Sequence, residues 1–322
     1  ERMEASAWPK DKLAKQLIFL GLTMVLMGAA GFMARRSIVL GRGDRRGAFR
    51  IALVLLALGL PAWALGAHHV ADMASEMGLV GRGAGLLLLQ AALVWLFYLA
   101  VEPYARRLRP WTLVSWARLF GGGFFDPVVS RDILIGLAWA VVMFQLNPLS
   151  RLVPRWLGQP GPEPSMGELG ALQGPGMLLA QLLQLAASSF LTTMGVLLLF
   201  VLLRLLLRRD ALAMAAVAAI WILPSVLSTW DTAWVSAVTT MVWTAAWILL
   251  LLRFGLLAAV VGFFACDVVE MLPLTTDLAS WTAAPTLLAV GVLGSLAIFA
   301  FRNAVGGLAL RRALVNETGS HP

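Results

Sequence analysis

The sequence predicts an all-α, polytopic integral membrane protein that forms a helical bundle of about nine transmembrane helices. Of its 322 residues, 60% are apolar and 13% are charged, whereas soluble domains average about 45–50% apolar and about 25% charged. The mean hydropathy of +0.84 agrees with this class. The composition excludes a soluble enzyme, and the single cysteine, Cys266, excludes a secreted domain built on disulfides.

Nine apolar runs are the candidate transmembrane helices, since about 20 apolar residues are enough to cross the hydrocarbon core. The fourth run is short and ends in polar residues. The seventh and eighth runs are separated by Arg253 alone, which predicts either a tight hairpin or one long broken helix. The runs cover residues 17–34, 51–67, 84–101, 133–147, 177–203, 211–229, 235–252, 254–272 and 285–301.

The basic residues indicate how these helices are oriented. If the loops alternate between two sides, one side contains 18 of the 25 lysines and arginines and the other contains 7. Cytoplasmic loops retain the excess of basic residues. We therefore expect an extracytoplasmic segment over residues 1–16, a membrane domain over 17–302 and a cytoplasmic tail over 303–322. The arginine clusters follow this topology, so the net charge of +8 does not indicate nucleic-acid binding.

Two loops are long. Residues 102–132, on the predicted cytoplasmic side, mix arginine with tryptophan and aliphatic residues. This mixture predicts a short amphipathic helix on the anionic leaflet that contacts lipid headgroups or a protein partner. The outer loop over residues 148–176 is rich in proline and glycine, which predicts no regular structure. The expected contact residues of the inner loop are Arg106, Arg107, Arg109, Trp111, Trp116 and Arg118.

Histidine and carboxylate residues after the second run are weak candidates for a metal site. On a helix, His68, Asp72 and Glu76 would share one face, and imidazole and carboxylate groups can bind a divalent metal. The simpler interpretation is a solvated outer loop, so no metal site is assigned.

Two carboxylates lie within a predicted span. Asp267 and Glu270 are three residues apart and share a helix face. An ionisable residue in the hydrocarbon region is a candidate proton relay or ion site, but both residues fall in the last turns of the run, where positioning at the interface is the simpler interpretation. Earlier in the chain, Gly81 and Gly85 form a GxxxG pattern, which is a weak motif for helix contact.

No motif indicates catalysis or a cofactor. The sequence has no HExxH, GxSxG or GxxxxGK[ST] pattern. Several segments nevertheless resemble one family, the membrane-embedded C-terminal region of multidomain serine/threonine protein kinases of acidobacteria and related bacteria. The matching segments include Leu40-Gly-Arg-Gly-Asp-Arg-Arg-Gly47, Glu102-Pro-Tyr104, Ser115-Trp-Ala-Arg-Leu119, Asp126-Pro-Val-Val-Ser-Arg-Asp132 and Pro273-Leu-Thr-Thr-Asp-Leu278.

The resemblance implies a multi-pass region of the bacterial inner membrane that follows a cytoplasmic kinase domain and an extracytoplasmic segment. The chain has no HRD-type catalytic loop, DFG or glycine-rich nucleotide loop, so no kinase catalysis is expected from it. We expect a non-enzymatic anchoring or sensing module whose partners are the bilayer, anionic headgroups and other membrane subunits, without nucleic acid. The alternatives are an accessory subunit of a respiratory or photosynthetic complex, and an intramembrane enzyme or ion transporter.

Overall fold

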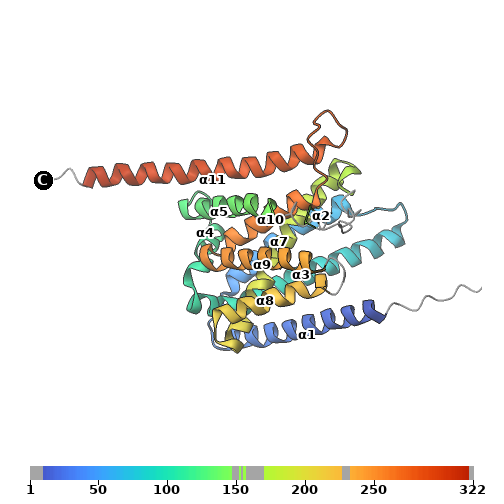
Figure 1. The fold of residues 1–322 in the computed structure, drawn as a ribbon, viewed down its shortest axis with the longest axis horizontal. Helices are drawn as coiled ribbons and strands as arrows, with labels where there is room; N and C mark the ends of the chain where they lie inside the picture. Colours follow the sequence, from blue (N-terminus) through green and yellow to red (C-terminus); the bar gives the residue numbers. More distant parts are fainter. Residues whose placement is uncertain (1–9, 147–151, 154, 157–169, 227–232, 319–322) are drawn as a thin grey trace, which may run out of the picture.

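The structure, a computed structural model, describes the backbone of residues 10–146, 152–153, 155–156, 170–226 and 233–318. Side chains are described for residues 20–21, 23–146, 152–153, 155–156, 170–221 and 238–306. Within these ranges the regular structure is entirely helical (Figure 1). The helices are α1 (Lys10–Val39), α2 (Arg45–Gly66), α3 (Met73–Leu108), η1 (Pro110–Leu113), α4 (Val114–Phe120), α5 (Pro127–Phe144), α7 (Pro175–Leu207), α8 (Asp210–Val226), α9 (Ala233–Phe254), α10 (Leu256–Met271) and α11 (Ala283–Thr318).

Each apolar run coincides largely with one helix, and the described residues contain no strand, which confirms the predicted all-α class. Within the described residues, five helices are long and apolar enough to cross a membrane: α2, α3, α5, α7 and the Ala283–Gly306 part of α11. Two shorter apolar stretches lie in α8 and α9. The chain therefore has the architecture of a multi-pass membrane protein, while the count of nine spans remains a prediction.

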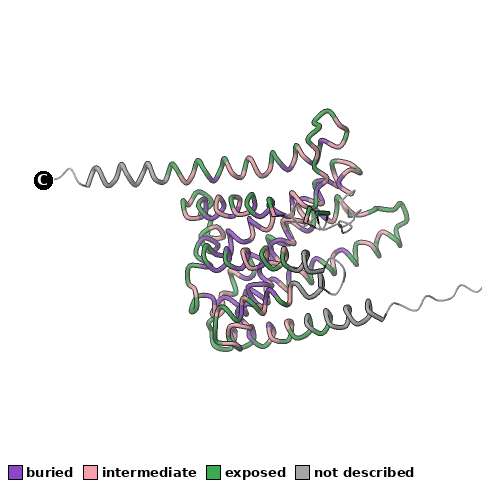
Figure 2. Tube along the Cα trace, viewed as in Figure 1, coloured by how far each residue is buried: buried purple, intermediate pink, exposed green. Residues whose placement is uncertain are grey.

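Large apolar side chains are exposed along the outside of the bundle. Val25 on α1, Val141 on α5 and Val290 on α11 are each more than 60% exposed. Exposed large apolar side chains in this number are unfavourable in water and normal against lipid. Figure 2 shows the buried residues concentrated in the middle of the bundle, whereas the described part of α11, along one margin, is a mixture of exposed and intermediate residues with few buried ones.

Aspartate side chains set where three of the helices begin. Asp44 accepts a hydrogen bond from the N–H of Gly47, Asp72 from that of Ser75, and Asp126 from that of Val128, each at 2.8 Å. Such N-caps satisfy N–H groups that have no partner in the first turn. Because Asp126 caps α5 and Pro127 follows it, α5 starts six residues before the predicted run at 133.

The ends of the chain differ from the predicted domain boundaries. α1 starts at Lys10, inside the segment expected to precede the membrane domain, and α11 continues to Thr318, through most of the expected tail. The predicted irregular loop over 148–176 lies mostly outside the described residues.

The α9–α10 connection settles the choice between a hairpin and a broken helix. Gly255 alone separates the two helices, and its φ of 107° and ψ of 179° reverse the chain direction. The indole Nε1 of Trp247 on α9 donates to the carbonyl oxygen of Ala259 on α10 at 3.3 Å. The two helices therefore form a tight hairpin.

The helix connections gather at two opposite ends of the bundle (Figure 1). We call one the basic end; it contains the turns at residues 40–44, 109–126, 208–209 and Gly255. The opposite end contains residues 67–72, 170–174 and 272–282. This alternation places the predicted arginine-rich loops at one end.

Candidate functional site

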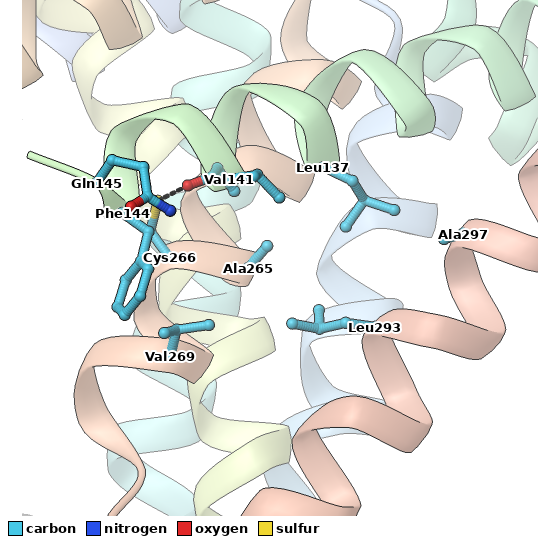
Figure 3. Close-up of a pocket in the computed structure, with 10 residues that line it drawn as sticks. Leu137, Val141, Phe144, Gln145, Ala265, Cys266, Val269, Leu293 and Ala297 are labelled. Atoms are coloured by element: carbon cyan, nitrogen blue, oxygen red, sulfur yellow. Dashed lines mark hydrogen bonds between the residues drawn. The ribbon is translucent and has the colours of Figure 1, made fainter. Parts of the chain in front are cut away.

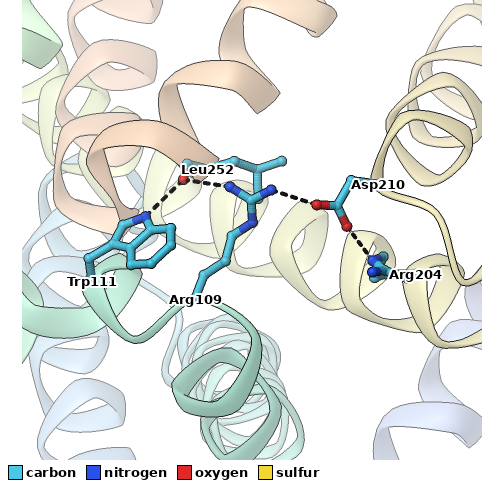
Figure 4. A network of polar contacts seen from close by, with 5 residues as sticks. All are labelled: Arg109, Trp111, Arg204, Asp210 and Leu252. Atoms are coloured by element: carbon cyan, nitrogen blue, oxygen red, sulfur yellow. Dashed lines mark hydrogen bonds and ion pairs between the residues drawn. The ribbon is translucent and has the colours of Figure 1, made fainter.

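A network of polar contacts at the basic end joins several helices, and we call it the polar junction (Figure 4). The guanidinium of Arg109, at the C-terminal cap of α3, donates to Asp210 Oδ2 at 2.7 Å and to the Leu252 carbonyl oxygen at 3.3 Å. Trp111 Nε1 donates to the same carbonyl at 3.1 Å. Arg204 on α7 forms an ion pair with the other oxygen of Asp210. The junction therefore connects α3, η1, α7, α8 and α9.

The α9–α10 turn fits closely against η1. A Cβ at Gly255 would lie 2.8 Å from the carbonyl oxygen of Thr112, closer than such atoms approach in proteins. The positive φ of this residue also favours glycine. Thr112 itself is 1% exposed, so the contact belongs to the protein interior.

Trp116 anchors α4 in the hydrophobic core. Its ring stacks on Phe190 of α7 with a centroid distance of 4.9 Å and an interplanar angle of 9°, and it also contacts Phe120. The side chain is 5% exposed. The prediction that Trp116 lies on the membrane surface is therefore wrong, because the residue fills a site between helices. Trp111 is 49% exposed.

The segment 102–132, predicted to be a loop that contains a short amphipathic helix, is not a single loop. Residues up to Leu108 complete α3, η1 and α4 follow, and residues from Pro127 belong to α5. Glu102 is 3% exposed and faces Arg106 one turn later, because α3 continues through this position and turns the carboxylate into the bundle.

Most arginines of this segment are paired within the chain. Arg106 pairs with Glu102, Arg118 with Asp126 at 2.8 Å, and Arg131 with Asp132 at 2.8 Å, in addition to Arg109 in the polar junction. Burial alone would raise the pKa of Asp126, but the Val128 N–H and the Arg118 guanidinium lower that pKa below its usual value. Arg107 is exposed. Most of the arginines expected to contact lipid headgroups therefore form ion pairs within the chain, and these pairs hold the segment in place.

The histidine and carboxylate cluster has a structural role at the opposite end. α3 begins only at Met73, so His68 and Asp72 do not share a helical face with Glu76. Asp72 is the N-cap, His68 is exposed, and Glu76 accepts from His69 at 2.6 Å and from the Val70 N–H at 3.1 Å. Within the described residues, no group of three potential metal ligands comes together. The helical metal-ligand arrangement is therefore wrong.

The two carboxylates of the predicted span 254–272, Asp267 and Glu270, lie in the last turns of α10. Asp267 Oδ2 is 3.4 Å from Ser189 Oγ of α7, and that hydroxyl also donates to the Leu185 carbonyl at 2.6 Å. Glu270 is partly buried one turn further on. The arrangement places an acidic group and a hydroxyl between two helices of the bundle.

An apolar cavity of about 240 Å³ lies between α5, α10 and α11 (Figure 3). Of its lining residues, only Gln145 and Cys266 have polar side-chain atoms, and the thiol of Cys266 lies 4.0 Å from the Ala140 carbonyl oxygen. The cavity therefore favours an apolar occupant over a charged one. The lining residues are Leu137, Ala140, Val141, Phe144, Gln145, Ala265, Cys266, Val269, Leu293 and Ala297.

Sequence reasoning missed the partners that complete the polar junction. Asp210 and the Leu252 carbonyl lie more than 100 residues from Arg109 along the chain, and no local pattern links them. The pair of Glu102 and Arg106 could have been found, because a spacing of four residues on a helix brings such side chains together. Comparison with protein-family models, curated proteins and solved structures found no match.

Proposed function

We propose that this chain is a non-catalytic anchoring and sensing module in the cytoplasmic membrane of a bacterium, either as the membrane region of a kinase-like receptor or as a scaffold subunit. In this proposal nine helices cross the bilayer, residue 1 is outside and the C-terminus is cytoplasmic. The polar junction is the observation that carries the proposal, since it ties the cytoplasmic segment 109–126 to helices from across the bundle.

The contacts of this segment provide a route for coupling. Trp116 packs on α7, and Arg109 and Trp111 bind the end of α9. A stimulus that favours one arrangement of these helices at the opposite end would move segment 109–126 with them. Arg107 is exposed and Trp111 is half-exposed, so a cytoplasmic partner could bind both side chains and respond to this movement.

The test uses the native polypeptide in nanodiscs made from native membranes. An antibody against the segment 109–126 should detect a polypeptide larger than 34.7 kDa that autophosphorylates. Asp210→Asn should change the autophosphorylation rate several-fold, because it removes the charge shared by Arg109 and Arg204. Asp277→Asn, an exposed position at the opposite end, is the matched control.

Other results would contradict the proposal. A polypeptide of this length in stoichiometric association with redox subunits would favour an accessory subunit of a respiratory or photosynthetic complex. An autophosphorylation rate that is the same in Asp210→Asn and Asp277→Asn would exclude the polar junction as the coupling element.

Asp267 supports a second candidate, an ion or proton pathway, since its carboxylate lies beside Ser189 between α7 and α10. If this candidate is correct, the double variant Asp267→Asn and Glu270→Gln abolishes proton or sodium flux into proteoliposomes. If wild type and variant show the same flux as empty liposomes, the candidate is excluded.

A further inference from the structure

The hairpin between α1 and α2 carries a concentration of exposed positive charge, and we call residues 35–50 the basic hairpin. Its six arginines are all exposed, and among the residues that the structure describes none of them forms an ion pair. They are Arg35, Arg36, Arg42, Arg45, Arg46 and Arg50.

The one acidic residue of the basic hairpin, Asp44, offsets one of these six charges, and among the described residues it forms no ion pair with any of the arginines. Asp44 is partly buried, and its carboxylate accepts the Gly47 N–H at 2.8 Å. Arg50 donates to the carbonyl oxygen of Phe120 at 3.3 Å, a bond that leaves its charge uncompensated. In segment 102–132, by contrast, Arg106, Arg109 and Arg118 each have a carboxylate partner.

The arginines at the start of α2 do not stabilise their own helix. Arg45 and Arg46 occupy its first turn, which contains no acidic residue. The amino-terminal end of a helix dipole favours negative charge and disfavours cations. The N-cap carboxylate of Asp44 supplies one negative charge at this end, and an external anion beside Arg45 and Arg46 would further reduce the unfavourable interaction.

Apolar side chains on the basic hairpin lie next to the arginines. Val39 is 75% exposed, Leu40 is 48% exposed and Phe49 is 58% exposed. A surface that combines exposed arginines with exposed aliphatic and aromatic groups matches the boundary between phosphate headgroups and acyl chains. A small soluble anion would use the charges and leave these apolar groups in water.

We propose that the basic hairpin binds the headgroups of anionic phospholipids in the leaflet at the basic end, with Val39, Leu40 and Phe49 in contact with the acyl region. The inference rests on the membrane placement in the proposed function. It assigns the anionic-lipid contact to residues 35–50 instead of 102–132, where all the arginines except Arg107 have a carboxylate partner.

The experiment measures phospholipid binding to the purified full chain in detergent by native mass spectrometry, with phosphatidylglycerol and phosphatidylcholine of identical acyl chains. Wild type should bind phosphatidylglycerol at least about tenfold more tightly. Arg42→Gln, Arg45→Gln and Arg46→Gln together should reduce this preference to about twofold or less. The triple variant Arg208→Gln, Arg253→Gln and Arg302→Gln also removes three exposed arginines and should keep most of it.

A second triple variant, Arg42→Lys, Arg45→Lys and Arg46→Lys, keeps the charge and should retain the preference, which separates lipid binding from misfolding. Glycerophosphoglycerol should not compete at the concentration of the lipid; if it does, the hairpin binds a free phosphodiester and the proposal is wrong. Equal loss in both glutamine variants would mean that general surface potential causes the preference, and no loss in either would exclude the basic hairpin. The measurement contains no kinase readout, so its failure is separate from failure of the proposed function.

Discussion

At the scale of single residues, Trp116 joins the basic end to the core. We expect Trp116→Ala to destabilise the protein by about 3–5 kcal/mol, because it removes a buried aromatic side chain that stacks on Phe190. Thermal unfolding in detergent, followed by loss of monodisperse protein, measures the effect. Trp281→Ala is the control, since Trp281 is 79% exposed and should change the midpoint little. Equal destabilisation by the two variants would contradict the assignment of Trp116 to the core.

His69 provides a pH-dependent contact at the opposite end. Its two ring nitrogens face the carboxylate of Glu76 and the carbonyl of Ala64, so both must donate, as only the imidazolium can. The Glu76 hydrogen bond, followed by the Ala64 bond, raises the pKa of His69 above its usual value. The contact therefore stabilises this turn fully below the unfolded pKa of about 6.5 and is lost as the pH rises through the higher folded pKa.

Glu76→Gln should lower the pKa of His69 toward its usual value. An NMR titration of the His69 ring protons, with the resonance assigned by the variant His69→Gln, measures this change. A titration midpoint that does not move in Glu76→Gln would show that the carboxylate does not hold the imidazolium.

At the scale of helices and turns, Gly255 sets the α9–α10 hairpin. Its φ of 107° and ψ of 179° lie in a region essentially restricted to glycine, where other residues cost about 1–3 kcal/mol. In Gly255→Ala the new Cβ would also clash with the Thr112 carbonyl oxygen, so we expect a clear drop in the midpoint of thermal unfolding. Gly85→Ala, in an open part of α3, should be neutral or slightly stabilising. If Gly255→Ala and Gly85→Ala change the unfolding midpoint equally, the close packing of the turn against η1 is contradicted.

Helix contacts show where sequence reasoning stops at this scale. The GxxxG pattern of Gly81 and Gly85 predicted a contact face, but a Cβ at either position would meet nothing within 4 Å. Gly83, two residues along and on the other side of the helix, lies against the Trp63 ring of α2. The GxxxG pattern shows only that two glycines are four residues apart. Which glycine lies in a helix contact depends on where the neighbouring helix packs, and the pattern does not contain that information.

At the scale of the whole molecule, labelling of single cysteines tests the number of spans. In a Cys266→Ser background, we expect Phe125→Cys and Arg208→Cys to be labelled only from the cytoplasm, and His68→Cys and Ala279→Cys only from outside. These positions lie in the turns of the basic end and of the opposite end, respectively. If only α2, α3, α5, α7 and α11 cross the membrane, Arg208→Cys and Ala279→Cys are labelled from the same side.

The positions of the helices could be predicted from the sequence, because crossing the hydrocarbon core requires long apolar runs that are visible one residue at a time. Which arginines pair with carboxylates and which stay unpaired could not be predicted from the sequence. Arg109 and Arg42 look alike in sequence, and they differ because Asp210 meets Arg109 across 101 residues whereas no described carboxylate pairs with Arg42. Contacts of that sequence separation depend on how the whole bundle packs, so local patterns do not reveal them.

The one-residue turn at Gly255 also has a consequence for biogenesis. If α9 and α10 both cross the membrane, as in the proposed topology, the one-residue turn leaves no loop between them and they would enter the bilayer as a pair. Leu252, at the end of α9, is synthesised 143 residues after Arg109, which binds its carbonyl. In that topology, the segment after α3 would stay on the cytoplasmic side without this partner until α9 is inserted, so the polar junction would close late in assembly.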